Sequence, residues 1–290
     1  MNRIALNLCF TWNLIERVVG RCYHSSLGKV IAIANQKGGV GKTTTAINLA
    51  AALAANELQV LLIDSDPQGN STTGLGVEKE TGLSTLYNAL IGSDPLADSV
   101  VQTGFDNLSL VPADQNLAAA NLELVELEDR QFRLRNAVAE LKSQFNFILI
   151  DCPPALDLLT INALTTADSV LIPIQCEFFA LEGISELMVT IDRIRSAYNH
   201  PIAVEGILLT MYDDRTNLAR QVATDLKEFF QDDILETVIP RSIRLAEAPS
   251  FGKPILTYDP RSKGAESYIR LAKEILQNEQ AARAAKESAR

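Results

Sequence analysis

The chain has 290 residues, of which 47% are hydrophobic and only 6% are aromatic. This content can build a substantial core, and it suits a layered α/β protein better than an all-β sandwich. The formal net charge of -10 argues against a uniformly basic nucleic-acid-binding coat, and no apolar run approaches the roughly 18 to 20 residues that a membrane-spanning helix needs.

Four cysteines and two histidines limit the metal chemistry that the chain can support. The cysteines contain no CxxC pair, which weakens any iron–sulfur or zinc site and predicts free thiols in a reducing cytoplasm. Both histidines stand alone in polar, turn-like surroundings, so neither is expected to be catalytic or to bind a metal. These residues are Cys9, Cys22, Cys152, Cys176, His24 and His200.

Residues 1–27 differ in character from the rest of the chain. Glu16 and Arg17 interrupt their apolar stretches, and no apolar segment ends in a small-residue cleavage site, so they make a poor secretory signal. A short amphipathic helix and a disordered tail both fit this composition. A further hypothesis treats this extension as a start-site artefact, with a UUG or CUG codon at Leu27 as the native start.

From residue 28 onward, apolar runs typical of strands alternate with helical patterns. In chain order, the expected strands span residues 30–34, 59–64, 108–112, 147–151, 169–175, 203–210 and 237–239. The expected helices span residues 43–55, 116–142, 158–166, 181–198, 216–230 and 264–278. Several strands are continuously apolar, as in a parallel sheet covered on both faces. This alternation predicts a doubly wound, mostly parallel α/β sheet with helices on both faces.

The sequence contains no clear boundary that would divide this pattern into separate domains. The acidic run at residues 123–129 is expected to lie on the solvated face of its helix. No internal repeat and no linker rich in Pro, Gly or Ser divides the chain, so we expect a single domain over residues 28–278. Residues 279–290 are expected to form a polar, helix-prone tail.

The stretch NQKGGVGKTTT, residues 35–45, links the first expected strand to the first expected helix. Glycines let backbone N–H groups converge on one point, and a helix N-terminus adds unpaired N–H groups with partial positive charge, which together suit a polyphosphate. Lys42 is placed to reach the β- and γ-phosphates, and the Thr43 hydroxyl to ligate Mg²⁺. The general P-loop pattern has a glycine where this chain has Gln36, so the loop is a variant. The expected phosphate ligands of this P-loop NTPase-like site are Gly38, Gly39, Val40, Gly41, Lys42, Thr43 and Thr44.

Acidic residues end two of the expected buried strands. Asp151 follows FILI at the carboxyl edge of the sheet, where ligands bind, and is the natural partner of Mg²⁺. Asp64 and Asp66 end the strand at 59–64. Asp66 lies further into the loop and is expected to polarise the attacking water or contact Mg²⁺, whereas a structural role is open for Asp64.

Five segments occur in this order along the chain: KGGVGKTTT, DSDPQGNST, LIDCPP, MYDDRTNL and IPRSIRLAEAPSFGKPI. Together they resemble the ParA/Soj chromosome- and plasmid-partitioning ATPases, which form the deviant Walker A class with MinD. The resemblance covers roughly residues 28–278. It implies ATP and Mg²⁺ as cofactors, slow ATP hydrolysis, a cytoplasmic, nucleoid-associated location and a ParB/Spo0J-type centromere-binding partner.

The resemblance also implies roles for single residues. Lys37 is expected to cross a homodimer interface and contact the phosphates of the partner's nucleotide, as a second cation supplied in trans. Gly38 is then expected at that interface, where a side chain would obstruct the ATP-sandwich dimer. Asp66 takes the hydrolysis role and Asp151 that of the Walker B acid. The residues implied near the adenine base are Met211, Pro240, Arg241 and Pro249.

A local basic region offers a way for an acidic chain to bind DNA. Residues 241–264 contain five Lys and Arg against two Asp and Glu, which is five minus two, or +3. The resemblance implies that Arg215 and Arg244 contribute to non-specific DNA binding. A dimer that aligns two such regions doubles the phosphate contacts, so binding would report the nucleotide state.

Two alternative functions are a membrane-recruited ATPase and an electron-transfer ATPase. A MinD-like, membrane-recruited ATPase needs a C-terminal amphipathic helix, but the chain after Gln277 has no Leu, Ile, Phe or Trp, so no membrane partner is expected. An electron-transfer ATPase like the nitrogenase iron protein needs bridging cysteines. Cys152 lies beside the expected Walker B acid and Cys176 at a strand end, and neither position suits a cluster ligand.

Overall fold

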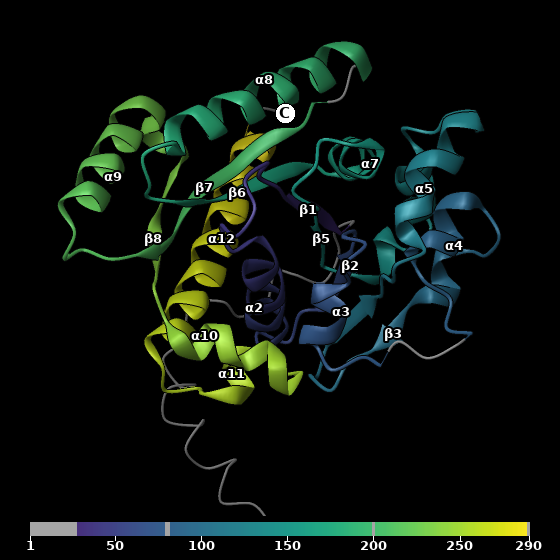
Figure 1. Cartoon of the computed structure of the whole chain (residues 1–290), viewed down its shortest axis with the longest axis horizontal. Helices are drawn as coiled ribbons and strands as arrows, with labels where there is room; N and C mark the ends of the chain where they lie inside the picture. Colours follow the sequence, from purple (N-terminus) through teal and green to yellow (C-terminus); the bar gives the residue numbers. More distant parts are fainter. Residues whose placement is uncertain (1–27, 79–81, 199–200, 289–290) are drawn as a thin grey trace, which may run out of the picture.

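The computed structural model describes residues 28–78, 82–198 and 201–288. Within these residues, eight strands form one sheet in the order β3-β4-β2-β5-β1-β6-β7-β8 (Figure 1). Every neighbouring pair is parallel except β3 with β4, so the predicted α/β fold with a mostly parallel sheet is confirmed. The strands are β1 (Lys29–Ile33), β2 (Val60–Asp64), β3 (Val101–Gln102), β4 (Leu108–Val111), β5 (Phe147–Asp151), β6 (Ser169–Gln175), β7 (Ala203–Tyr212) and β8 (Ile234–Pro240). The interpretations of residues 1–27 concern a segment outside the described residues.

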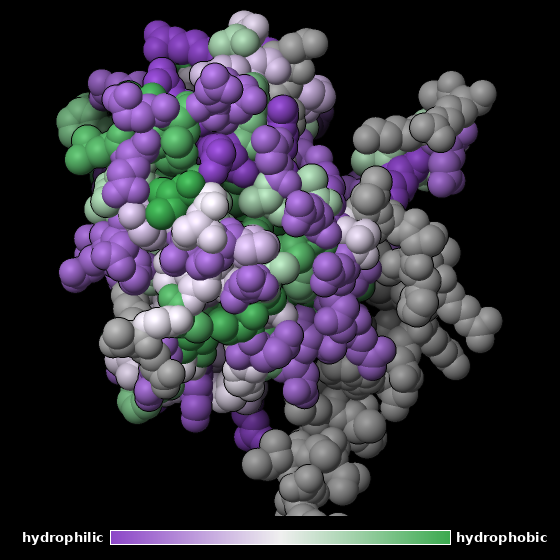
Figure 2. Space-filling view, turned by 90° about the vertical axis from the view of Figure 1, so that its right-hand side faces the viewer, coloured by the Kyte–Doolittle hydropathy of each residue, from purple (hydrophilic) through white to green (hydrophobic). Residues whose placement is uncertain are grey.

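Helices cover both faces of this sheet, as predicted (Figure 1). One face carries α2 (Lys42–Ala54), α10 (Ile243–Glu247), α11 (Ile255–Tyr258) and α12 (Lys263–Ser288). The other carries α4 (Leu86–Ile91), α5 (Leu117–Glu123), α6 (Arg133–Ala139), α7 (Leu158–Thr166), α8 (Ala180–Tyr198) and α9 (Asn217–Phe230). The short helix α3 (Asn70–Gly74) lies beyond the end of β2. The surface over α4 and α5 is mixed, with small apolar patches among polar side chains (Figure 2).

The continuous apolar runs of the central strands have a direct packing explanation. On β1, Ile31 and Ile33 enter the cluster under α2 and α12, whereas Val30 and Ala32 enter the cluster on the opposite face. Both faces of the strand are therefore dry, and alternation of apolar and polar residues is lost. Full burial of each larger aliphatic side chain contributes about 1.5–3 kcal/mol.

The prediction of one long helix over residues 116–142 is wrong. The structure has α5, a 3₁₀ turn at Leu124–Glu126, a break, α6 and a further 3₁₀ turn at Lys142–Gln144. In the break, Leu127 is extended (φ -93°, ψ 142°) and Asp129 adopts a left-handed φ of 52°. The acidic run is thus largely a turn, where the exposed carboxylates of Glu128 and Asp129 remain in water.

The last helix is longer than the pattern at 264–278 indicated. Helix α12 continues to Ser288. Its additional turns contact β1, because Glu279 lies 2.6 Å from Lys29 Nζ. Within the helix, Glu279 also lies 2.7 Å from Arg283 Nε. Lys29 also pairs with Glu205 on β7 at 2.7 Å. Among the described residues, no helix combines the length and apolar character needed to cross a bilayer.

The segment after β2 packs against the chain around residue 250. A Cβ atom at Gly74 would lie 3.6 Å from Pro249 Cβ. A Cβ atom at Gly252 would lie only 2.6 Å from Gly76 Cα, and both glycines have left-handed φ angles, +61° and +72°. Two backbone segments therefore meet here at a distance that leaves no room for a side chain.

We predict that Gly252→Ala lowers the unfolding free energy by about 1–3 kcal/mol, because the added methyl group meets backbone and φ is unfavourable for alanine. Gly104→Ala is the matched control, since nothing lies within 4 Å of its Cβ position. The control should stay within about 0.5 kcal/mol of the parent chain. Urea unfolding measures both, and equal effects would contradict the close backbone contact.

Candidate nucleotide-binding site

The loop between β1 and α2 has the backbone geometry of an anion cradle. Gly39 and Gly41 adopt left-handed φ angles of +74° and +88°, and Gly41 forms the N-cap of α2. Nothing lies within 4 Å of the Cβ positions of Gly38 and Gly39, so the loop faces open space on that side. Thr210 on β7 fixes the loop from beneath, with its hydroxyl 2.7 Å from Val40 O. This backbone geometry is compatible with the anion cradle predicted for residues 38–44, which stays a prediction.

Lys42 is buried at the first turn of α2. Its Nζ donates to Lys37 O at 3.0 Å, so the ammonium group lies under the loop. Burial lowers the pKa of Lys42, and the nearby Asp151, Cys152 and Asp66 oppose that shift. A cation held in this way needs an anion, and a phosphate group in the cradle would supply one.

Lys37 points away from Lys42 and pairs with an acid from the end of β6. Its Nζ lies 2.5 Å from Glu177 Oε2. The Lys37 backbone is fixed independently, because its N–H donates to Asn35 Oδ1 at 2.9 Å. Asn35 is buried and donates in turn to Pro173 O on β6 at 2.8 Å. Sequence reasoning missed Glu177, although its position two residues after a strand at the carboxyl edge was a usable signal.

Asp64 organises the loop that follows β2. Its Oδ2 accepts from both Thr72 N and Thr72 Oγ1, at 2.8 and 2.7 Å, and its Oδ1 accepts from Asp66 N at 3.2 Å. Asp64 is fully buried, and this burial raises its pKa. These contacts support a structural role for Asp64 in holding the loop after β2. Thr72 itself lay within the stretch DSDPQGNST, but its bond to Asp64 was not anticipated.

Asp151 lies beside Asp64, because the two residues are partners in the β2–β5 register. Its Oδ2 accepts from Ser71 Oγ at 2.8 Å. Burial and the neighbouring Asp64 carboxylate raise the pKa of Asp151, and the Ser71 and Thr43 hydroxyls lower it. Among the described residues, Asp151 Oδ1 and Ser65 Oγ are the buried side-chain atoms without a hydrogen-bond partner.

A magnesium ion fits these residues on chemical grounds. The buried Asp151 carboxylate has a free oxygen, and the Thr43 hydroxyl is near enough to affect its pKa. Oxygen ligands of this kind suit Mg²⁺, which also keeps water and phosphate oxygens as ligands. Asp66 is half-buried, and its Oδ1 accepts from Gln68 N at 2.9 Å. It therefore stands at the open end of the site, beyond the buried Asp64.

The residues expected near the adenine base fall into two groups. Met211 is the next-to-last residue of β7 and has a left-handed φ of 48°. Pro240 is opposite Tyr212 in the β7–β8 register, and Arg241 N donates to Tyr212 O at 3.2 Å. These three lie together at the carboxyl edge of the sheet. Pro249 lies on a different element, the 3₁₀ turn Ala248–Phe251, which packs against α3.

Both arginines expected to bind DNA are exposed and paired with acids. Arg215 binds Asp213 through two hydrogen bonds, at 2.7 and 2.6 Å, and lowers the pKa of Asp213 to about 2. Arg244 lies on α10 and pairs with Glu247 at 3.0 Å and with Asp259 at 3.6 Å. Surface pairs of this kind are weak, so a phosphate can compete for either guanidinium.

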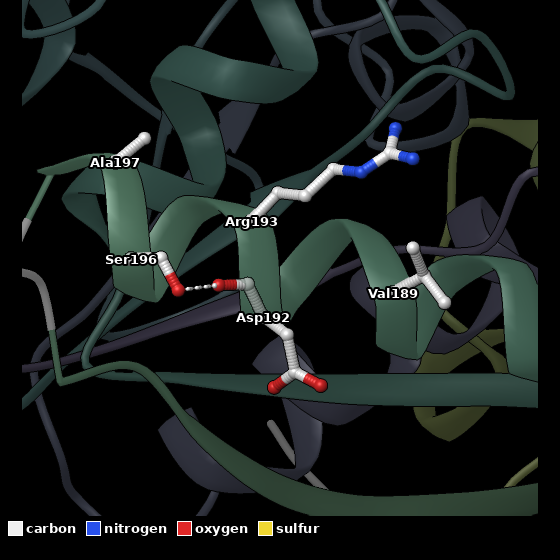
Figure 3. A pocket seen from close by; sticks show the side chains of 5 residues that line it. All are labelled: Val189, Asp192, Arg193, Ser196 and Ala197. Atoms are coloured by element: carbon white, nitrogen blue, oxygen red, sulfur yellow. Dashed lines mark hydrogen bonds between the residues drawn. The ribbon is translucent and has the colours of Figure 1, made fainter.

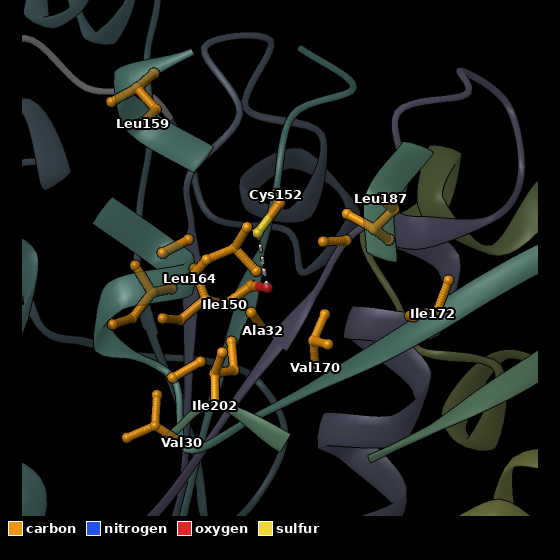
Figure 4. Close-up of a cluster of buried hydrophobic side chains, with 14 of the residues drawn as sticks. Val30, Ala32, Ile150, Cys152, Leu159, Leu164, Val170, Ile172, Leu187 and Ile202 are labelled. Carbon is orange, nitrogen blue, oxygen red and sulfur yellow. Dashed lines mark hydrogen bonds between the residues drawn. The ribbon is translucent and has the colours of Figure 1, made fainter. Parts of the chain in front are cut away.

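The described cysteines are placed in the core. Cys152 lies in an apolar cluster with Ile150, Leu164 and Leu187, where its thiol points to Ile150 O (Figure 4). Burial raises the pKa of this thiol, and it raises the pKa of Cys176 to about 11. Neither thiol reaches a surface where two copies could share a cluster.

A shallow hollow also lies on α8. It is lined by Val189, Asp192, Arg193, Ser196 and Ala197, all from one helix, and Ser196 bonds back to Asp192 O (Figure 3). One helix face cannot enclose a small ligand.

The chain is similar in sequence and in structure to known proteins. An AAA domain family matches residues 28–204. The sporulation initiation inhibitor protein Soj of Bacillus subtilis is 52% identical over 252 residues, covering 87% of this chain and all of that protein. The chromosome partitioning protein ParA of Myxococcus xanthus is 48% identical over 271 residues, covering 93% of this chain and 96% of that protein. A cobyrinic acid a,c-diamide synthase from Mycobacterium smegmatis, solved with ADP and magnesium, is 34% identical with a TM-score of 0.78, covering 88% and 97% of the two chains.

We predict different effects of removing the two acids at the end of β2. Asp64→Ala should lower the unfolding free energy by about 2–4 kcal/mol, because two buried donors of Thr72 and the partly buried Asp66 N–H lose their acceptor, and this outweighs the relief of a buried charge. Asp66→Ala should change it by less than about 1 kcal/mol, because that side chain is half-exposed. Urea unfolding at neutral pH compares them. Equal stability losses would show that Asp64 does not anchor the loop.

Proposed function

Because the chain belongs to the ParA/Soj family of chromosome-partitioning proteins, we propose that it is an ATP-dependent switch for DNA partitioning. The observation that carries this proposal is the pair of lysines in one loop. Lys42 is buried beneath the cradle, whereas Lys37 extends sideways to Glu177. Lys42 is proposed to bind the triphosphate of its own subunit, and Lys37 that of a second copy. Residues 28–278 are proposed to form the ATPase domain.

ATP and Mg²⁺ are the proposed cofactors, and the chain's own residues divide the work. The backbone N–H groups of residues 38–44 and the Lys42 ammonium group bind the phosphates. Thr43 and Asp151 would hold Mg²⁺, which supplies charge neutralisation on the β- and γ-phosphates. Asp66, at the open end of the site, orients the attacking water. Met211, Pro240 and Arg241 are proposed to contact the base, and Pro249 is proposed to contact it from a different element.

Dimerisation is proposed to follow ATP binding. Lys37 is 39% exposed in its side chain, and Gly38 presents no side chain to obstruct an approaching copy. Phe178 and Phe179 follow Glu177 and are 76% and 61% exposed, an unusual apolar pair for a free surface. Two anionic nucleotides facing each other need cations from both sides, which makes association depend on ATP.

We predict that Asp66→Ala binds ATP but hydrolyses it at least about 100-fold more slowly, because the attacking water loses its orienting group. The variant should sediment as a dimer with ATP and Mg²⁺ and as a monomer with ADP. Adding Lys37→Ala to it should restore the monomer. An Asp66→Ala chain that turns over ATP at the normal rate would remove this residue from the mechanism.

The dimer is proposed to bind DNA without reading its sequence. Arg215 and Arg244 are the proposed phosphate contacts, and two copies double their number. The segment that carries Arg244 packs against elements next to the proposed nucleotide site. Gly252 meets Gly76, just after α3, and Ile255 N donates to Asn48 Oδ1 on α2 at 2.7 Å. A nucleoid-associated, cytoplasmic location and a ParB/Spo0J-type partner that stimulates hydrolysis complete the proposal. No membrane partner is proposed.

We predict that Arg244→Glu reduces retention of random-sequence DNA by about tenfold or more, with ATP-dependent dimerisation unchanged, because one phosphate contact per subunit becomes repulsive. Arg193→Glu on α8 is the control with the same charge change. Arg244→Gln tests the loss of charge without new repulsion, and it should lower the salt slope by about 1.8 per dimer. Mobility shifts without nucleotide, with ADP and with ATP, at two salt concentrations, measure this. Equal loss in the α8 control would point to net charge instead.

A further inference from the structure

Lys37 and Glu177 form an ion pair that the proposed ATPase mechanism does not use. The two residues are 140 positions apart, and their charged atoms lie 2.5 Å from each other. Glu177 is held in a turn at the end of β6, because its N–H donates to Gln175 O at 2.8 Å. The pair therefore joins the phosphate loop to the neighbouring strand end within one subunit.

We propose that Glu177 is a positioning residue that holds the Lys37 ammonium group within its own subunit and must release it before two nucleotide-bound copies associate. This inference rests on the proposed role of Lys37 in trans. The occupant that displaces Glu177 is then the polyphosphate of a second copy of this chain.

The backbone around Lys37 leaves the side chain as the part that moves. Lys37 N–H donates to the buried Asn35, and Lys37 O accepts from Lys42 Nζ at 3.0 Å. Both contacts involve groups that are themselves buried, so they fix where the side chain begins. Rotation of the four-carbon stem can then exchange one anionic partner for another without moving the loop.

Charge makes this exchange a competition. A triphosphate that approaches Lys37 must take the place of the carboxylate already paired with it, so Glu177 opposes association by occupying the ammonium group. The side chains of Lys37 and Glu177 are 39% and 45% exposed, and exposed pairs of this kind are weak. The restraint is thus strong enough to shift the equilibrium and weak enough to be reversed by ATP.

The test measures the monomer–dimer dissociation constant of the full chain with Mg²⁺ and a non-hydrolysable ATP analogue. Glu177→Gln should tighten the dimer by about fourfold to twenty-fivefold, which is about twofold to fivefold for each of two exposed pairs. Glu186→Gln, an equal charge change at an exposed position of α8, should match the parent chain. Thermal unfolding should be nearly unchanged in both variants.

A double variant separates positioning from general charge. In a Lys37→Ala chain, Glu177→Gln should have no further effect, because there is no ammonium group to release. An unchanged or weakened dimer in Glu177→Gln would overturn the proposal, as would equal tightening by Glu186→Gln or tightening that persists without Lys37. If Lys37→Ala itself dimerises like the parent chain, the proposed trans role fails, and that result is independent of Glu177.

Discussion

The carboxylates of Asp64 and Asp151 lie side by side, buried, at the ends of two neighbouring parallel strands. Two such charges are unfavourable together unless nearby groups compensate them. Thr72 and Ser71 of α3 donate hydrogen bonds to them, and the buried Lys42 lies close enough to interact electrostatically with Asp151. The position of α3, the burial of Lys42 and the free oxygen of Asp151 are thus parts of one electrostatic arrangement, which a cation and a polyphosphate would complete.

The same arrangement links the phosphate site to the surface that carries Arg244. Helix α3 is held by the two carboxylates on one side, and on the other it packs against Pro249 and Gly252. Asn48 on α2 adds a second link through Ile255. Backbone contacts of this kind leave little room to adjust locally, so a displacement of α3 must be shared by the segment at 249–255.

Among the described residues, local signals predicted seven of the eight strands and missed the two-residue β3. They also led to the proposed cradle and its lysines. Continuous apolar runs such as FILI require burial on both faces, and KGGVGKTT has few uses other than binding an anion. The break at Leu127–Asp129 was missed because helical periodicity continues through it, while tertiary packing decides the turn. Glu177 and the contact of Gly76 with Gly252 join distant parts of the chain, and only the folded sheet brings them together. For the same reason the sequence pattern could not show that Pro249 lies on a different element from Met211 and Arg241.

Three surface cations have a proposed function, and each is paired with a carboxylate. This pairing explains how an acidic chain can bind polyanions. Lys37 pairs with Glu177, Arg215 with Asp213, and Arg244 with Glu247. Each cation therefore has a carboxylate in its own subunit, and each pair is exposed enough to be weak. One such exchange gains little from a single phosphate. Several exchanges made together, as in a dimer on DNA or around two nucleotides, add up, and binding then depends on assembly rather than on the charge of one subunit.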